Sequence, residues 1–267
     1  MYKVLSIAGS DSSGGAGIQA DLKTFQEYKV YGMTALTAVA TMNPEDNWSH
    51  TVYPLSLEAL QSQLKTIIQG IGVDALKTGM LGSKEIINLV AQTIQENHLK
   101  NVVIDPVMVC KGAEEALYPE VNQLLRDKLV PLALIVTPNL FEAAQLSGLN
   151  EVKTLEDMKK AAVLIKEKGC GFVLIKGGSR LEEEKYAVDL LYDGQQFTYL
   201  EGEKIVTSHT HGAGCTYSAA ITAGLAQGKE LKEAVQQAKQ FVTAAIKAGF
   251  PLNQFIGPVN HAAFYQQ

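Results

Sequence analysis

Short runs of aliphatic residues alternate along this chain with longer stretches in which apolar residues recur every three to four positions. The short runs predict buried strands, and the longer stretches predict amphipathic helices. Strands are expected at residues 3–8, 36–41, 75–77, 102–104, 134–136 and 172–175. Helices are expected at residues 19–28, 57–68, 83–97, 119–128 and 140–168, the last broken near 148–150. Aliphatic strands that alternate with helices predict an α/β fold whose mostly parallel sheet is covered on both faces.

The pattern changes at two places along the chain. Residues 188–192 and 196–200 flank the turn Asp193-Gly194 and predict an antiparallel hairpin. The alternating segment 48–53 predicts an edge strand, and only helices are expected after residue 212. The sequence has no internal repeat, low-complexity linker or shift in composition, so residues 1–267 are predicted to form a single domain.

The chain carries 28 acidic and 23 basic residues, which gives a net charge of -5. This balance argues against a nucleic-acid-binding surface and favours a protein that binds small ligands. No apolar run approaches the ~20 residues of a membrane span, and the run at residues 4–8 is too short for a signal peptide. We therefore expect a cytoplasmic protein without nucleic-acid or membrane partners. Cys110, Cys170 and Cys215 form no CxxC pair and are expected to be free thiols, with Cys170 structural.

Residues 206–228 combine a glycine-rich turn with the start of a predicted helix. Gly212 and Gly214 flank Ala213 and allow a tight turn, after which Cys215 falls near the first helical position. The first turn of a helix leaves N–H groups without partners and carries the positive end of the dipole, so an anion-binding loop is predicted. The same position predicts a lowered pKa for the Cys215 thiol. The alternative is a plain strand-to-helix connection followed by a core cysteine.

Polar residues directly follow several predicted strands. Asp105 ends one strand, Asn139 and Glu142 follow the next, and Lys176 ends another. Because ligands bind at the carboxyl ends of the strands in such sheets, these side chains are expected near the anion loop. Oxygen ligands suit Mg²⁺ and a lysine neutralises phosphate charge, so the set predicts a phosphoryl-transfer site. Taken singly, Asp105 could be a turn former, Asn139 and Glu142 helix-capping residues, and Lys176 a solvated side chain.

Six ordered segments resemble the vitamin-kinase branch of the ribokinase-like superfamily and extend over essentially the whole chain. They are AGSDSSGGAGIQADLKTF (8–25), KTGML (77–81), DPVMVCKG (105–112), TPNLFEA (137–143), KGG (176–178) and THGAGCT (210–216). The resemblance implies a single-domain, three-layer α/β/α fold with a mostly parallel central sheet, and a homodimer. It also implies transfer of the γ-phosphoryl group of ATP, with Mg²⁺, to a hydroxymethyl group on a heteroaromatic ring.

Within that branch the chain resembles both cysteine-type pyridoxal kinases and the hydroxymethylpyrimidine (phosphate) kinases of thiamin synthesis. Met42 stands where the pyrimidine kinases carry an acidic or amide residue, and a thioether cannot make that hydrogen bond to the aminopyrimidine. Cys110 lies where those enzymes usually lack a cysteine. Pyridoxal is therefore the favoured substrate, with pyridoxine, pyridoxamine and hydroxymethylpyrimidine as further candidates and the thiamin enzyme as the alternative. The polar strand-end residues together with Cys215 argue against a non-catalytic vitamin binder.

The resemblance assigns further roles by motif position. The N–H groups of Gly212, Ala213 and Gly214 are expected to meet the transferring phosphoryl group, and Asp21 a polar edge of the substrate ring. The other expected substrate-binding residues are Gly9, Met42, Met80, Val107 and, as a weaker candidate, His50. The expected ATP-binding residues are Asn139, Glu142, Lys176, Thr210, His211, Gly212 and Val242, with Asp105 and Glu142 toward Mg²⁺.

Two roles remain open for Cys215. Many ribokinase-like sugar kinases have Asp at this position, so a Cys215 thiolate is a candidate base for the hydroxyl proton, although a base gives modest help in a loose phosphoryl transition state. Alternatively, the thiol forms a reversible hemithioacetal with the aldehyde of pyridoxal. Cys110 lies on a segment with a nearby glycine and is a candidate to close over the site and pass protons to Cys215. The alternative for Cys110 is a surface thiol.

Overall fold

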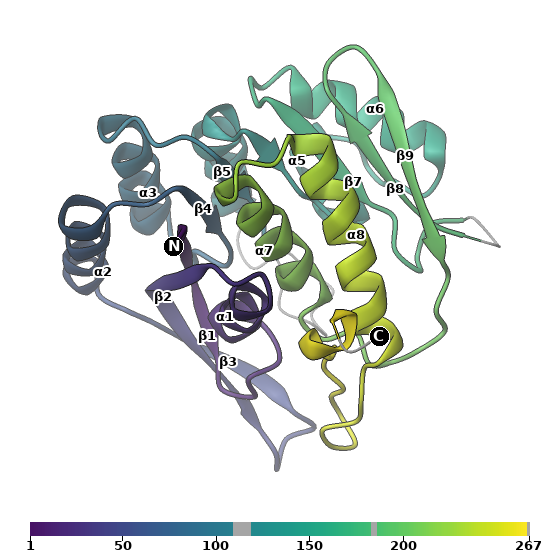
Figure 1. Ribbon diagram of the computed structural model, residues 1–267, viewed down its shortest axis with the longest axis horizontal. Coiled ribbons are helices and arrows are strands. Elements are labelled where there is room, and N and C mark those ends of the chain that lie inside the picture. Colours follow the sequence, from purple (N-terminus) through teal and green to yellow (C-terminus); the bar gives the residue numbers. More distant parts are fainter. Residues whose placement is uncertain (109–118, 183–185, 266–267) are drawn as a thin grey trace.

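The computed structural model describes residues 1–108, 119–182 and 186–265. Through these residues runs a nine-stranded sheet in the order β3-β2-β1-β4-β5-β6-β7-β8-β9 (Figure 1). The six strands from β2 to β7 in this order are parallel to one another. They are β2 (Tyr31–Asn43), β1 (Lys3–Asp11), β4 (Ala75–Thr78), β5 (Val102–Ile104), β6 (Ile135–Val136) and β7 (Phe172–Lys176). The predicted mostly parallel sheet is confirmed.

Both edges of the sheet are antiparallel. β3 (Ser49–Pro54) pairs with β2, while β8 (Tyr186–Tyr192) pairs with β7 and with β9 (Phe197–Glu203). The predicted edge strand and hairpin are thus confirmed. β2 begins earlier than predicted because its first residues alternate between buried and half-buried positions instead of forming an aliphatic run.

Helices form a layer on each face of the sheet. In front of the sheet in Figure 1 lie α1 (Gly17–Glu27), α7 (Ala213–Ala226) and α8 (Leu231–Lys247). The other face carries α2 (Leu57–Leu64), α3 (Lys84–Glu96), α4 (Pro119–Leu124), α5 (Leu140–Ser147) and α6 (Leu155–Lys166). Short π- or 3₁₀-helical segments follow at Lys65–Ile71, Leu125–Leu129, Val130–Leu132 and His261–Phe264. The predicted three-layer α/β/α arrangement is therefore confirmed.

Successive residues of the central strands serve the two helical layers in turn, because side chains alternate across a sheet. The layer of α1, α7 and α8 packs on Val4, Ala75, Val103, Ile135 and Leu174. The opposite layer packs on Leu5, Leu76, Ile104, Val136 and Ile175. Burial on both faces explains why these strands consist almost wholly of aliphatic residues.

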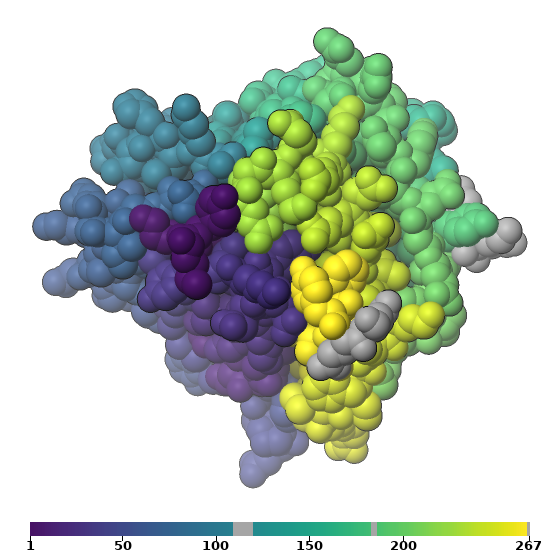
Figure 2. Space-filling view, viewed as in Figure 1, coloured from purple at the N-terminus to yellow at the C-terminus, as the bar shows by residue number. Residues whose placement is uncertain are grey.

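The face formed by α7 and α8 lies between the purple N-terminal region and the green hairpin β8–β9 (Figure 2). α7 is buried along nearly its whole length, and the small residues predicted there allow the strands and α8 to approach it closely. None of the helices in the described part of the chain combines the length and apolar character that crossing a membrane requires.

The connection from β6 to α5 ends at Asn139, where a capping box begins the helix. Asn139 is the N-cap of α5, and its side chain accepts the N–H of Glu142 while the Glu142 carboxylate accepts the N–H of Asn139. This reciprocal capping box fixes both side chains at the carboxyl end of β6. Gly148, at φ 79, ends α5 in the left-handed conformation, which confirms the predicted break in the long helical stretch.

Candidate active site

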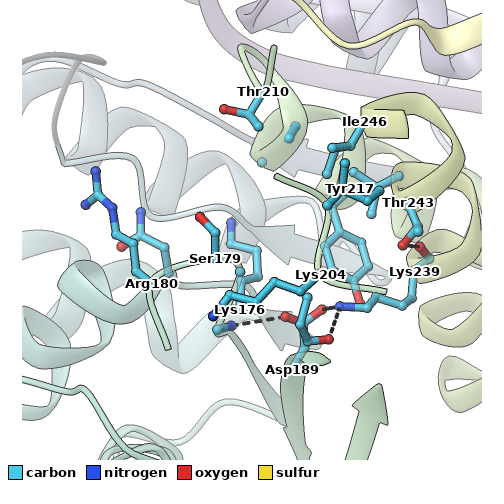
Figure 3. A pocket seen from close by; sticks show the side chains of 18 of the residues that line it. Lys176, Ser179, Arg180, Asp189, Lys204, Thr210, Tyr217, Lys239, Thr243 and Ile246 are labelled. Atoms are coloured by element: carbon cyan, nitrogen blue, oxygen red, sulfur yellow. Dashed lines mark hydrogen bonds and ion pairs between the residues drawn. The ribbon is translucent and has the colours of Figure 1, made fainter. Parts of the chain in front are cut away.

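Two cavities adjoin at the carboxyl ends of the parallel strands, where the loop that begins α7 lines both. The β2 pocket, about 370 Å³, lies among the ends of β1, β2 and β4. The α8 pocket, about 400 Å³, lies between the β8–β9 hairpin and α8 (Figure 3). The place where the two cavities meet is called the junction, and the residues that line both cavities there are Asn139, Lys176, Thr210, Ala213 and Gly214.

The loop before α7 has the tight turn that its glycines predicted. Gly212 adopts φ 80, a left-handed conformation that favours glycine, and a side chain there would also collide with the carbonyl of Gly15. Ala213 donates its N–H to Thr210, so this group is already used within the turn. Gly214 faces both pockets, and a Cβ on it would lie 3.5 Å from Lys176 Nζ. The loop and the Lys176 ammonium thus lie side by side where the two cavities meet.

Asp105 and Lys176 meet at this junction as an ion pair. Lys176 Nζ lies 3.1 Å from Asp105 Oδ1, and both side chains are largely buried. Ser218, on the second turn of α7, donates its hydroxyl to Asp105 Oδ2 at 3.0 Å. Burial alone would lower the pKa of Lys176, but the carboxylates of Asp105 and Glu142 raise it. Lys176 is therefore held as a cation beside the anion loop.

Glu142 adds a second carboxylate to the β2 pocket. Burial raises its pKa to about 7, Lys176 opposes this effect, and the charge of Asp105 strengthens it. The structure thus brings together Asp105, Asn139, Glu142 and Lys176, as the strand-end positions predicted. Their individual catalytic roles remain predictions.

The donors at this junction fit Mg²⁺ of the kind that bridges protein and phosphate. Among the described residues there is no group of three or more His, Cys, Asp or Glu side chains that could hold a metal ion. Mg²⁺ in phosphoryl-transfer sites commonly uses one or two carboxylates together with waters and substrate phosphates. Asp105 and Glu142 supply two carboxylates beside a cavity, and the raised pKa of Glu142 marks a place where a cation would relieve the repulsion between them.

Cys215 lines the β2 pocket, but the prediction of a lowered pKa for its thiol is wrong. Burial raises the pKa of this thiol to about 11 and the charges of Asp21 and Asp105 add to the rise, while Lys77 and the N–H of Gly17 oppose it. Desolvation of the sulfur outweighs the field of the helix terminus. Cys110 lies outside the described residues.

Asp21 requires a correction. It was expected at the edge of the substrate ring, but it is completely buried and does not line either cavity. Its carboxylate pairs with Lys77 Nζ at 2.7 Å and accepts the hydroxyl of Ser6 at 2.5 Å. Asp21 lies on the face of α1 that packs against the sheet. Its contacts with Ser6 of β1 and Lys77 of β4 hold the helix against these two strands.

The remaining residues expected to bind the substrate share the β2 pocket. Met42 and His50 lie opposite each other in the register of β2 and β3, and Met80 and Val107 contribute to the wall. A side chain at Gly9 would approach Met80 Cε to 2.6 Å, so the glycine keeps this part of the pocket open. Met42, Met80 and Val107 thus give this side of the pocket an apolar wall, as is common in sites for small organic ligands.

Sequence reasoning missed Asp11, which ties the first glycine-rich loop to the anion loop. Asp11 Oδ2 lies 2.6 Å from Nε2 of His211, and the carboxylate also accepts the N–H groups of Ser13 and Ala16. Burial acts to raise the pKa of Asp11, but the hydrogen bonds from His211 and Ser13 lower it to about 2. Asp11 belongs to the AGSD segment, so the available signal was an acid between strand and loop.

The α8 pocket contains Val242, as predicted for the nucleotide-binding side. Its other walls include Ala187 and Asp189 of β8, together with Tyr217 of α7 and Lys239 of α8. Of the predicted ATP-side residues, Glu142, His211 and Gly212 line the β2 pocket, whereas Thr210 lines both cavities. Cys170 is fully buried away from both cavities, as a structural thiol was predicted to be.

The chain matches a family model described as phosphomethylpyrimidine kinase over residues 11–260. It is 62% identical to the pyridoxine kinase of Bacillus subtilis (strain 168) over 263 residues, which cover 98% of this chain and 97% of the relative. It is 43% identical to the hydroxymethylpyrimidine/phosphomethylpyrimidine kinase of the same organism over 264 residues, 99% of this chain and 96% of the relative.

Two solved structures are similar over nearly the full length. An ADP complex of Bacillus subtilis pyridoxal kinase has a TM-score of 0.97 and 60% identity, with 100% of each chain covered. The pyridoxal kinase of Staphylococcus aureus in complex with AMP-PCP and pyridoxal has a TM-score of 0.93 and 51% identity, covering 99% of this chain and 94% of that one. Adenine nucleotides thus bind to proteins of this fold.

Proposed function

This chain belongs to the phosphomethylpyrimidine kinase family, and from this premise we propose that it is an ATP-dependent pyridoxal kinase. It phosphorylates the 5'-hydroxymethyl group of pyridoxal and forms pyridoxal 5'-phosphate. The observation that carries the proposal is the pair of adjoining pockets, which meet at a glycine-rich loop beside Lys176 and Asp105. A flat ring in the β2 pocket and a nucleotide in the α8 pocket would bring their reacting ends together at this junction.

The choice of pyridoxal is supported by the similarities and by the β2 pocket. Identity is higher with the Bacillus pyridoxine kinase than with the hydroxymethylpyrimidine kinase of the same organism. Met42 lines the pocket with a thioether, which cannot replace the acidic or amide partner of an aminopyrimidine. The thiamin-pathway kinase remains the second candidate because the family model carries that activity in its description. We expect pyridoxine, pyridoxamine and hydroxymethylpyrimidine to be accepted less well.

The junction residues divide the work of phosphoryl transfer. The N–H groups of Gly212 and Gly214 and the Lys176 ammonium stabilise the negative charge of the transferring group, whereas the N–H of Ala213 is engaged by the carbonyl of Thr210. Asp105 and Glu142 would hold Mg²⁺, through waters, with Asn139 on the phosphate side. The metal would neutralise phosphate oxygens when bound. Asp11 and His211 keep the two glycine-rich loops together, so that the hydroxymethyl group and the phosphoryl group meet at short range.

Burial raises the pKa of Cys215 to about 11, which favours the protonated thiol. We infer that its sulfur adds to the aldehyde carbon of pyridoxal while the thiol proton passes to the aldehyde oxygen, giving a reversible hemithioacetal. The alternative role, a base for the hydroxymethyl proton, would require the bound ligands to lower the thiol pKa.

We further infer a homodimer, which the elution volume and light scattering of the purified protein would test.

The test is ATP-dependent turnover of the purified protein on pyridoxal, hydroxymethylpyrimidine and its monophosphate under identical Mg-ATP conditions. We expect the highest kcat/KM with pyridoxal and no second phosphorylation of the pyrimidine. Met42→Gln should shift the kcat/KM ratio toward hydroxymethylpyrimidine by about tenfold, the value of one discriminating hydrogen bond. Thr51→Gln, on the exposed side of β3, is the matched control. Conversion of the monophosphate to the diphosphate would instead identify a thiamin-pathway kinase.

A further inference from the structure

A buried ion pair stands in the wall of the α8 pocket. Lys239 Nζ of α8 lies 2.7 Å from Asp189 Oδ2 of β8, and Figure 3 shows the pair beside the ring of Tyr217. The Asp189 and Lys239 side chains are only 3% and 11% exposed. On each element the other buried residues are uncharged, so both side chains depart from the apolar pattern of their segments.

Asp189 uses its second carboxylate oxygen on the phosphate side of the site. Oδ1 accepts the backbone N–H of Gly177 at 3.0 Å, and Asp189 lies directly opposite Lys176 in the register of β7 and β8. Gly177 is tightly packed, because a Cβ there would collide with the carbonyl of Val188. Movement of Asp189 would therefore shift the turn that immediately follows Lys176.

Lys239 is equally constrained on the other side of the pair. Its ammonium also donates to the carbonyl of Ala187 at 3.1 Å, and a Cβ on Gly202 of β9 would come within 3.2 Å of its side chain. The lysine therefore fastens α8 to β8, and its side chain passes close to β9 at Gly202. The next turn of α8 supplies Val242, Thr243 and Ile246 to the pocket wall.

A buried ion pair is seldom retained for stability alone, because removing two charges from water offsets most of their attraction. The contacts of this pair are better explained by the two segments that it holds in place, the turn at Gly177 and helix α8. One carboxylate joins the turn after the phosphate-side lysine to the helix that forms the far wall of the α8 pocket. The width of this pocket and the position of Lys176 are thus set by the same side chain.

We propose that Asp189 and Lys239 are positioning residues for the nucleoside triphosphate: they fix the distance between the phosphate-binding turn and the wall that holds the base. This inference rests on the proposed function, because it takes the α8 pocket to be the nucleotide site. It assigns the pair no contact with the vitamin and no chemical step. Loss of the pair should therefore weaken nucleotide binding and leave vitamin binding unchanged.

The experiment measures the Kd of ADP by calorimetry and the KM of ATP and of pyridoxal in Lys239→Met. We expect Kd and KM for the nucleotide to rise about tenfold or more, since misplaced positioning groups cost one to two orders of magnitude. KM for pyridoxal should stay within about twofold of the parent value. Lys239→Arg, which keeps the cation, should restore most of the nucleotide affinity.

The matched control is Lys232→Met, which removes the exposed ion pair of Lys232 with Asp193, also between α8 and the β8–β9 hairpin. It should leave the Kd of ADP unchanged. If Lys239→Met does not fold, the double variant Asp189→Asn/Lys239→Met removes both charges of this pair and gives the same test. Unchanged ADP affinity, or an equal rise in both KM values, would overturn the inference. Because ADP binding does not require turnover of pyridoxal, failure of the proposed substrate is seen separately.

Discussion

The β2 pocket and the α8 pocket share one loop but are built differently. The β2 pocket presents chemically distinctive groups, the sulfurs of Met42, Met80 and Cys215 and the imidazole of His50. In the α8 pocket, Val242 and Ile246 form an apolar wall on α8, where Lys239 pairs with Asp189, and Lys176, Arg180 and Lys204 also line the cavity. The β2 pocket thus offers chemical groups that can discriminate between rings, whereas the α8 pocket combines an apolar wall with charged side chains, which suits the nucleotide proposed for it.

This difference explains why the residues of the β2 pocket were easier to predict from the sequence than those of the α8 pocket. The β2 pocket is assembled from short ordered segments, each next to a strand end. The α8 pocket is assembled from single positions on a hairpin and a helix. Variants that affect one pocket, the other or their junction therefore test whether the separation is real.

The largest effect is expected at the junction, for Asp105→Asn. This change removes the charge that pairs with Lys176 and one of the two carboxylates proposed to hold Mg²⁺. We expect kcat to fall by about a thousandfold, as for other groups that stabilise transition-state charge. KM for both substrates should change much less, because the walls of the pockets stay intact. Steady-state kinetics at saturating Mg-ATP measures this.

The control for this variant is Asp127→Asn, in an exposed ion pair with Arg126 away from both cavities. It should have parental kinetics. An Asp105→Asn enzyme with an unchanged kcat, or one whose only defect is a higher KM for ATP, would contradict the assignment of Asp105 to the junction.

A smaller and more selective effect is expected for Cys215→Ala. Its kcat/KM for pyridoxal should fall by about a hundredfold, the lower end of what a reacting side chain contributes. Pyridoxine has no aldehyde, so its turnover should be far less affected, and KM for ATP should not change. Competition kinetics with the two vitamins measures the selectivity directly.

Cys170→Ala is the paired control, since this thiol is buried and its hydrogen bond goes to the carbonyl of Ile165. Full activity of Cys215→Ala on pyridoxal would exclude the hemithioacetal. An equal loss on pyridoxal and pyridoxine would instead favour the role of Cys215 as a base.

The smallest effect on turnover is expected for Asp11→Asn, which acts mainly on stability. The pKa of Asp11 is about 2 in the folded protein against an ordinary value of 3.8. Its ionised form therefore stabilises the fold above pH 4, and this contribution is lost as the pH falls toward 2. The variant should lose about 2 kcal/mol of unfolding free energy at pH 7. Urea unfolding at pH 7, 4 and 3 should show the difference from the parent shrinking.

Glu45→Gln, on the exposed β2–β3 turn, is the control for a lost surface carboxylate. A difference between Asp11→Asn and the parent that stays constant from pH 7 to pH 3 would show that the aspartate acts through packing instead of charge.

Most of the fold was predictable because burial imposes a period on the sequence. The strands β5 (Val102–Ile104) and β7 (Phe172–Lys176) are apolar on both faces except at Lys176. The hairpin is marked by the Asp193-Gly194 turn. The early start of β2 was missed, and so was the π-helical geometry of Lys65–Ile71, which overlaps the end of the helix predicted over 57–68. Both depend on how neighbouring elements cover a segment, which local periodicity does not record.

The candidate site was predictable where a residue's place along a strand fixes its direction. Asp105 and Lys176 therefore meet as expected. Asp21 was misplaced because the sequence does not tell which face of α1 reaches the cavity. The elevated pKa of Cys215 depends on burial and on distant carboxylates. The Asp189–Lys239 pair was missed because it joins two elements that carry no recognisable motif.

The hydrogen bond between Asp11 and His211 spans 200 positions of the sequence. In kinetic terms this contact has a very high sequence separation, and such contacts close late because a long chain must first be ordered. A polypeptide emerging during synthesis would hold the first glycine-rich loop long before its partner exists. The two glycine-rich loops can therefore be held together only after the chain has been made as far as His211 and this distant contact has closed.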